Sequence, residues 1–294
     1  MRSLLTGRRW RRWALAAWFI SLLVAALPVR AADTAPRIAT LDWTVAETLI
    51  GIDARLVGLA QLDGYDSWVA EPVVPSTVRD LGLRAQPNLE QLAAIAPDRI
   101  ALTPMFANLS GRLSSIAPVD VFELYGPDVD TWPALRRVTR ELGEYAGRRE
   151  RAEALIESTE DRLAELATRL PEEPPALIVI QFMDERHVRV FGKNGLYDAV
   201  MERLGIENGW TGETNRWGFS LVGLEELAEL DGRIVVVRPY PVGVERALAE
   251  SAFWQRLTVG SGHAALEIEP VWSFGGLPSA RRFAGQLLEA LDAQ

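Results

Sequence analysis

The residue types that usually carry catalysis or metal binding are scarce in this sequence. There is no cysteine, so the chain has no thiol nucleophile, no disulfide and no thiolate metal site. The two histidines, His187 and His263, lack the spacing of a metal-ligand pair or of a catalytic base. We find no G-x-S-x-G nucleophile elbow and no phosphate-binding glycine loop. We therefore expect neither an enzyme nor a resident metal ion or intrinsic cofactor.

Tryptophans are the more informative feature. Four of them lie in predicted loops or just after predicted strands: Trp43, Trp68, Trp217 and Trp272. Ligands of open α/β sheets bind beyond the carboxyl ends of strands, where the sequence predicts Trp43 and Trp272. A cluster of indoles suits a bulky, partly apolar ligand, and Arg84, in a loop before a predicted helix, could add one fixed positive donor. The alternative for Arg84 is an ordinary surface arginine.

The elements that would position these residues alternate between strand and helix. Strand patterns at 37–43, 55–60 and 99–104 are separated by helical patterns at 44–52 and 88–95, the second with Asn88 as its cap. The alternation resumes with strands at 176–182 and 187–192 around a hairpin turn, a helix at 195–206, and strands at 232–240 and 263–272. A last helix covers 279–294, with Ser279 as its expected cap. This order is typical of two α/β lobes.

Between the two lobes the sequence predicts one long amphipathic helix. Apolar or small residues recur at helical spacing from Ala152 to Leu170, with charged residues on the other face. At 1.5 Å per residue the segment 148–170 would be about 33 Å long. The predicted domains are therefore an N-terminal lobe (36–147), a linking helix (148–170) and a C-terminal lobe (171–294). A single stiff connection of this kind permits only small hinge motion.

The first 31 residues have the layout of a cleaved secretory signal. Clustered arginines precede an apolar run from Trp13 to Leu27, and small residues suit a cut after Ala31. The paired arginines also allow twin-arginine export. A membrane anchor is the alternative, but the run is shorter than the ~20 residues that a span needs. The remaining chain has 25 basic and 40 acidic residues, a formal net charge of −15. We expect a periplasmic monomer without a nucleic-acid partner.

Several stretches resemble the periplasmic ferric hydroxamate siderophore-binding proteins of ABC importers. They are RIATLDWTVAETLIGI, DLGLRAQPNLEQL, HVRVFGKNGLYDAVMERLGIENGWTGETNRWG and PVWSFGG. NGWTGETNRWG is the most specific, whereas NLEQLAAIAPD alone indicates only the wider superfamily, which also binds haem, vitamin B12 and catecholate siderophores. The resemblance runs from about Arg37 to the C-terminus. It implies an α/β fold of two lobes joined by one long α-helix, with a shallow cleft between them. It also implies delivery of a ferric hydroxamate siderophore to an ABC permease with its ATPase.

The resemblance also implies roles for individual residues. Arg84 matches the arginine that hydrogen-bonds the iron-bound hydroxamate oxygens, and the four tryptophans match aromatic cleft positions. Phe106 stands where the family commonly has a tyrosine whose hydroxyl also reaches the hydroxamate. Ser273 and Phe274 replace an aromatic pair, so Phe274 joins the cleft. Because the siderophore already fills the coordination of the iron, the protein needs no iron ligands, only apolar walls and a donor.

Two acidic residues match a separate function of the superfamily. Glu90 and Glu225 correspond to glutamates, one per lobe, that dock onto arginine pockets of the two permease halves. Stabilisation of a helix start by an acidic side chain is a compatible alternative. Two other functions stay open from the sequence: the same type of binding protein with another iron chelate, haem or a corrinoid as cargo, and a secreted carbohydrate-active enzyme. The second would need a carboxylate pair beside the tryptophans, where the acids Asp42, Asp66 and Glu213 lie in separate segments.

Overall fold

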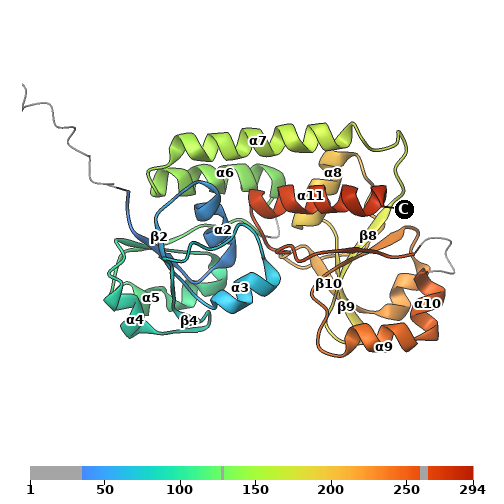
Figure 1. Ribbon diagram of the computed structural model, residues 1–294, viewed down its shortest axis with the longest axis horizontal. Coiled ribbons are helices and arrows are strands. Elements are labelled where there is room, and N and C mark those ends of the chain that lie inside the picture. Colours follow the sequence, from blue (N-terminus) through green and yellow to red (C-terminus); the bar gives the residue numbers. More distant parts are fainter. Residues whose placement is uncertain (1–34, 127–128, 259–263, 294) are drawn as a thin grey trace, which may run out of the picture. The chain divides into compact units, whose positions relative to one another are not determined.

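The structure, a computed structural model, describes residues 35–126, 129–258 and 264–293. The predicted signal peptide (1–31) and His263 lie outside the described residues. The described chain contains two five-stranded sheets (Figure 1). We call the first sheet with its connecting helices the N-lobe, and the second sheet with its helices the C-lobe. No helix within the described ranges is both long and apolar enough to cross a membrane.

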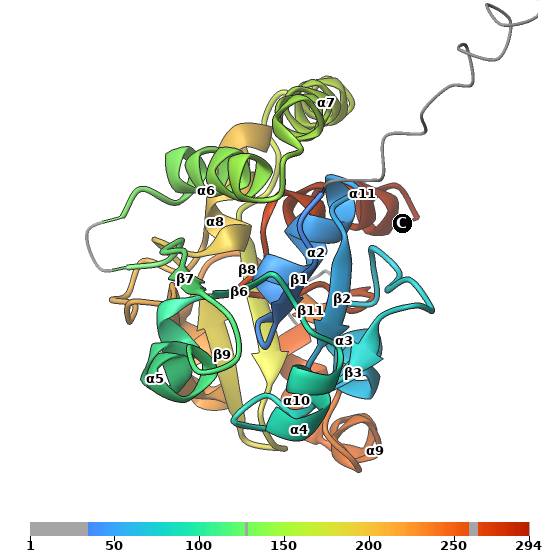
Figure 2. The same ribbon diagram turned by 90° about the vertical axis from the view of Figure 1, so that its left-hand side faces the viewer.

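The N-lobe sheet is parallel throughout, with the strand order β3-β2-β1-β6-β7 (Figure 2). Its strands are β1 (Ile38–Thr40), β2 (Leu56–Leu59), β3 (Arg79–Asp80), β6 (Arg99–Leu102) and β7 (Val119–Val121). The connections contain the helices α2 (Trp43–Gly51), α3 (Leu62–Trp68), α4 (Leu89–Ala94), η2 (Pro104–Leu109) and α5 (Ser110–Leu113), and the hairpin β4 (Gly82–Leu83) and β5 (Gln86–Pro87). Because the strands are parallel, the segments that follow β1, β6 and β7 emerge at one edge.

The prediction that Trp43 ends the first strand is wrong. Strand β1 stops at Thr40, and Trp43 is the first residue of helix α2. The reason is the cap formed by Asp42, whose Oδ1 accepts a hydrogen bond from the backbone N–H of Thr44 at 2.8 Å. Trp43 therefore lies at the carboxyl edge of the sheet as expected, but on a helix whose start is fixed.

Two helices connect the two sheets in the chain. α6 (Thr131–Tyr145) and α7 (Arg149–Ala167) pack against each other and are joined by a short turn (Figure 1). α7 is the predicted long helix, and its 19 residues span about 28 Å. It also packs against α8 and α11 of the C-lobe. The linking helix is thus part of a packed layer and not a free rod.

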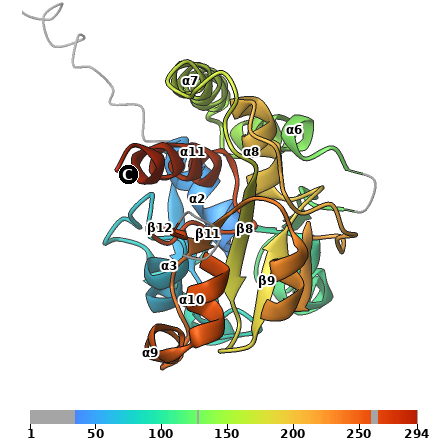
Figure 3. The same ribbon diagram turned by 90° about the vertical axis from the view of Figure 1, so that its right-hand side faces the viewer.

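The C-lobe sheet is mixed, in the order β10-β9-β8-β11-β12. Figure 3 shows β9, β8, β11 and β12 of this sheet, and Figure 1 shows β10. Strands β8 (Leu177–Phe182), β11 (Arg233–Val237) and β12 (Leu266–Ile268) are parallel, whereas β9 (His187–Phe191) runs antiparallel to both β8 and β10 (Phe219–Gly223). The predicted hairpin of β8 and β9 is therefore confirmed. Helices α8 (Leu196–Leu204) and α11 (Leu277–Asp292) cover one face, and α9 (Val244–Glu250), α10 (Ala252–Thr258) and the 3-10 helix η3 (Leu224–Glu229) cover the other.

One hydrophobic core extends through both lobes. The same buried cluster contains Ile38 and Leu49 of the N-lobe and Val179 and Leu287 of the C-lobe, together with the inner faces of α6, α7 and α8. Each sheet has a second, separate cluster on its other face. Since close-packed interiors do not part without loss of contacts, this shared core resists separation of the lobes.

Candidate functional site

Arg84 lies in the turn of the small hairpin that follows β3, between β4 and β5. Its side chain is only 13% exposed. The Nε atom donates a hydrogen bond to the carbonyl oxygen of Leu41, which directly follows β1, over 3.1 Å. This bond draws the guanidinium across the carboxyl edge of the sheet. The alternative of a freely solvated surface arginine is therefore wrong.

The guanidinium of Arg84 is surrounded by aromatic rings. Its carbon lies 4.1 Å from the ring centre of Trp43, 4.8 Å from that of Phe106 and 5.4 Å from that of Trp272. Phe106 belongs to η2, which follows β6, and Trp272 lies in the loop between β12 and α11. Three sequence segments from two lobes thus converge on one cation, in the geometry of cation–π contacts.

Asp42 supplies the nearest opposite charge. Its Oδ2 accepts a hydrogen bond from Thr103 Oγ1 at 2.6 Å and lies 3.9 Å from a terminal nitrogen of Arg84. Burial lowers the pKa of Arg84, and the charge of Asp42 acts in the opposite direction. The carboxylate is already held by Thr103 and by the helix cap, and the other contact of a terminal guanidinium nitrogen is a long one of 4.0 Å to the sulfur of Met105, a weak acceptor. The terminal nitrogens therefore keep donor capacity for a ligand.

The aromatic cluster continues into the C-lobe. The ring of Trp272 lies 5.2 Å from that of Phe274, and Phe274 lies 5.9 Å from Trp217. Trp217 precedes β10, is half-buried, and is 6.5 Å from the ring of Tyr125, which follows β7 in the N-lobe. Its neighbour Arg216 is exposed and lies 3.8 Å from a carboxylate oxygen of Glu123. The cluster therefore has walls from both lobes.

Hydrogen bonds hold the loop of Trp272 and Phe274 against the N-lobe. Thr44 Oγ1 donates to the carbonyl oxygen of Phe274 at 2.6 Å and accepts from the indole nitrogen of Trp272 at 3.1 Å. Tyr125 donates its hydroxyl to the carbonyl oxygen of Gly275 at 2.7 Å. The backbone of this C-lobe loop is thus fixed by N-lobe side chains.

A buried carboxyl group completes this connection. Glu47 of α2 accepts hydrogen bonds from the backbone N–H of Gly276 and from the hydroxyl of Ser279. Burial, the largest effect, raises the pKa of Glu47 to about 8, against the lowering effect of these hydrogen bonds. The prediction that Ser279 caps the last helix is wrong, because α11 begins at Leu277 and the hydroxyl of Ser279 is used by Glu47 instead.

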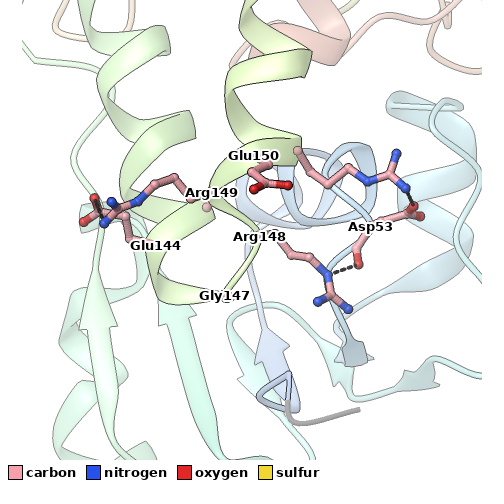
Figure 4. A pocket seen from close by; sticks show the side chains of 8 residues that line it. Asp53, Glu144, Gly147, Arg148, Arg149 and Glu150 are labelled. Carbon is pink, nitrogen blue, oxygen red and sulfur yellow. Dashed lines mark hydrogen bonds and ion pairs between the residues drawn. The ribbon is translucent and has the colours of Figure 1, made fainter. Parts of the chain in front are cut away.

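The space enclosed by these side chains is small, about 10 Å³. That is room for about one water molecule. A much larger hollow, of about 750 Å³, lies at the turn between α6 and α7 (Figure 4). There Arg149 pairs with Glu144, Arg151 pairs with Asp53, and the lining contains no aromatic residue. Its charges are mutually compensated, so the aromatic cluster around Arg84 is the better candidate for a ligand site.

Six of the seven residues predicted to bind ligand come together. Arg84, Trp43, Phe106, Trp272, Phe274 and Trp217 form one continuous set of contacts. Trp68, the last residue of α3, is half-buried against the core but makes no ring contact with these six described residues. Thr44, Glu47 and Tyr125 were not predicted as residues of the site. Of these three, only Tyr125 has a feature in the sequence that could have indicated it, namely its position after a parallel strand.

The two glutamates with a predicted docking role are both exposed. Glu90 lies in the first turn of α4, where the predicted cap is confirmed: Asn88 Oδ1 accepts from the N–H of Gln91 at 3.0 Å. Glu225 lies in the first turn of η3, a 3-10 helix and not the α-helix that the sequence suggested. The structure thus leaves both carboxylates accessible at helix starts, one in each lobe.

Comparison with known proteins agrees with this geometry. The periplasmic binding protein family matches residues 38–258. The iron(3+)-hydroxamate-binding protein FhuD of Escherichia coli (strain K12) is 28% identical over 260 residues, 88% of each chain. The Fe(3+) dicitrate-binding periplasmic protein FecB of the same organism is 24% identical over 270 residues, 89% of this chain and 86% of FecB.

Among solved structures, the siderophore-binding protein FhuD from Vibrio cholerae with bound Fe3+-Desferal superposes with a TM-score of 0.83 at 27% identity, covering 88% of this chain and 98% of that one. Members of the matched family are binding proteins, so the expectation of a protein without enzymatic activity is confirmed. The two-lobed α/β fold with a long connecting helix is confirmed as well. The chain belongs to the periplasmic binding protein family.

Proposed function

We propose that this protein captures a ferric hydroxamate siderophore in the aromatic cluster around Arg84 and delivers it to an ABC permease and its ATPase. One observation carries the proposal: a largely buried guanidinium held between three aromatic rings, with one terminal nitrogen engaged only at long range, 3.9 Å from Asp42 and 4.0 Å from the sulfur of Met105. The rings supply apolar walls for the organic part of a chelate. The guanidinium supplies the charge-assisted donor that iron-bound hydroxamate oxygens require.

The chemistry of the site favours a chelate over bare iron. No group of three or more potential metal-ligating side chains occurs among the described residues. A ligand that brings its own coordination sphere does not need such a group. The enclosed space is too small for a chelate, so the ligand lies on the solvent side of the rings, or the rings move apart to admit it. Trp68, half-buried on α3, is proposed as an outer wall that contacts the larger part of the ligand.

Two relatives support the cargo class. E. coli FhuD is a hydroxamate-binding protein by name, and V. cholerae FhuD is bound to Fe3+-Desferal. The dicitrate-binding relative FecB supports a ferric carboxylate chelate as second candidate. The secreted carbohydrate-active enzyme is no longer a candidate, because the family consists of binding proteins.

Delivery of the ligand requires a surface of this protein that the permease recognises. We propose that Glu90 and Glu225, exposed on the two lobes, pair with basic residues of the two permease halves. The protein would work as a monomer in the periplasm after removal of residues 1–31, with the lobes 36–147 and 171–294 joined through the helix 148–170. The negative charge of the mature chain is compatible with a basic docking site.

A fluorescence titration tests the cargo. The chain from residue 32 onward is titrated with a ferrichrome-type ligand, ferrioxamine B, ferric dicitrate and haem, following tryptophan emission. Quenching at micromolar or lower concentrations of a ferric hydroxamate is expected, because Trp43, Trp272 and Trp217 surround the site. Binding of ferric dicitrate alone would assign the carboxylate cargo, and a Soret band on the purified protein would assign haem. No response to any hydroxamate contradicts the proposal.

A further inference from the structure

A second arginine lies close to the aromatic cluster, on the C-lobe sheet. Arg189 is in β9, directly opposite Gln181 of β8 and Leu221 of β10. Residues opposite each other on antiparallel strands present their side chains on the same face of the sheet. Phe219, two residues before Leu221, shares this face. The face therefore carries a row of residues that begins at buried Gln181 and ends at Leu221, which is 61% exposed.

The guanidinium of Arg189 is packed against two rings. Its carbon lies 5.1 Å from the ring centre of Phe219 and 5.8 Å from that of Phe274. Phe274 is the same ring that contacts Trp272 and Trp217 in the candidate site. Arg189 thus contacts the same aromatic cluster as Arg84, through Phe274, whereas Arg84 contacts it through Trp272, Trp43 and Phe106.

The charge of Arg189 has little compensation. Its hydrogen bond to Gln181 Oε1 is long, 3.4 Å, and it forms no ion pair with a carboxylate of the described chain. Burial lowers its pKa, the sign of a cation that has lost water without gaining a counter-ion. Arg84 and Arg282, which are more deeply buried, each have a carboxylate within ion-pair distance, Asp42 and Glu71 respectively. A half-buried guanidinium of this kind is stabilised by a bound anion.

The two arginines are close enough to serve one ligand. The guanidinium of Arg84, the ring of Trp272, the ring of Phe274 and the guanidinium of Arg189 follow one another at 5.4, 5.2 and 5.8 Å. The straight-line distance between the two cations cannot exceed the sum of these steps. A chelate whose iron-bound oxygens face Arg84 can therefore extend a side arm to Arg189.

We propose that Arg189, oriented by Gln181, is a second anion-binding residue of the site, and that the cargo is a ferric hydroxamate that bears a carboxylate. This inference rests on the proposed function and narrows its substrate class. The neutral amide of Gln181 accepts a hydrogen bond from the guanidinium without cancelling its charge, and the rings of Phe219 and Phe274 pack beside it. In a chain with so large an excess of acidic residues, a local uncompensated cation is what lets an anionic ligand approach.

Three forms of one chelate test the proposal. Ferrioxamine B has a pendant amine, which is acetylated to give a neutral arm or succinylated to give a carboxylate arm, while the iron–hydroxamate core stays the same. For the unmodified protein, the succinylated form should bind at least about tenfold more tightly than the acetylated form, as expected for one charge-assisted hydrogen bond. In Arg189→Leu the ratio of the two dissociation constants should fall to about one. Arg186→Leu removes an exposed arginine from the adjacent turn and should keep the ratio of the unmodified protein.

The outcomes separate the two proposals. A ratio near one in the unmodified protein, or an unchanged ratio in Arg189→Leu, overturns the role of Arg189 while leaving hydroxamate binding in place. Absence of binding to all three forms overturns the proposed function itself. Circular dichroism and thermal unfolding establish that each variant is folded. If Arg189→Leu does not fold, Arg189→Gln takes its place in the comparison of the two dissociation constants. This variant also removes the charge but keeps a polar side chain beside Gln181.

Discussion

Replacing Arg84 by alanine should weaken ferric hydroxamate binding by roughly 30- to 1,000-fold. The terminal guanidinium nitrogens can donate one or two charge-assisted hydrogen bonds to iron-bound oxygens, since the Nε atom is already bonded to Leu41 and the Asp42 carboxylate is 3.9 Å away. Such bonds contribute about 1.5–3 kcal/mol each, and a loss of about 2–4 kcal/mol corresponds to that range of affinity. Arg84→Lys keeps the charge but loses the flat stacking on Trp43, so we expect an intermediate loss of about tenfold.

The assay is tryptophan quenching by ferrioxamine B at constant ionic strength. Arg79→Ala is the matched control, because Arg79 is an exposed arginine of the same lobe, in β3. Folding of Arg84→Ala is checked by thermal unfolding, since Asp42 keeps its bonds to Thr103 and to the N–H of Thr44 without the arginine. If folded Arg84→Ala binds as tightly as Arg79→Ala, the assignment of Arg84 as the donor is wrong.

Three further predictions concern stability, cargo affinity and delivery. The folded-state pKa of Glu47, about 8, lies above its ordinary value of 4.5, so its contribution to stability is complete below about pH 4.5 and is lost as the pH rises through 8. Denaturant unfolding should therefore show a free energy of unfolding that falls by up to about 4–5 kcal/mol between pH 5 and pH 9. The Glu47→Gln variant should lack this pH dependence, and parallel pH profiles of the two proteins would refute the prediction. Phe106→Tyr adds a hydroxyl beside Arg84 and should strengthen ferrioxamine binding about 3- to 10-fold in titrations; weaker binding would show that the hydroxyl does not reach the ligand. Glu90→Arg and Glu225→Arg should each reduce the uptake of the ferric chelate from ligand-loaded protein into permease proteoliposomes at least about tenfold. The control Glu229→Arg changes another exposed glutamate and should leave uptake unchanged. Equal uptake with all three variants would exclude docking through Glu90 and Glu225.

The sequence predicts the elements better than their ends. Apolar patterns predict β1, β2 and β6 of the N-lobe and β8, β9, β11 and β12 of the C-lobe, and the amphipathic spacing after residue 148 predicts α7. The short strands β3 and β7, the strand β10 and the helix α6 were not predicted. The start of α2 was misplaced because an apolar Trp43 continues the strand pattern, while the Asp42 cap that ends the strand is visible only as one polar residue. Ser279 looks like a cap by type, but a partner more than 200 residues away in the chain takes its hydroxyl.

The candidate site shows the same limit. Residue type and loop position indicate Arg84, Trp272 and Trp217, because indoles and an arginine in loops have few core roles. Arg189 and Glu47 could not be indicated in this way. Both lie inside regular elements, where a charged residue usually points to solvent, and only the three-dimensional packing shows that one faces aromatic rings and the other is buried between the lobes.

The position of the iron tests the central claim most directly. Crystals of the protein with a bound ferric hydroxamate, measured at the iron absorption edge, locate the metal without any assumption about the ligand. We predict one anomalous peak within about 5 Å of a terminal nitrogen of Arg84, as a hydrogen bond to an iron-bound oxygen requires. The peak should lie over the rings of Trp43 and Trp272. A peak at the hollow between α6 and α7, or anywhere beyond the reach of Arg84, would contradict the account.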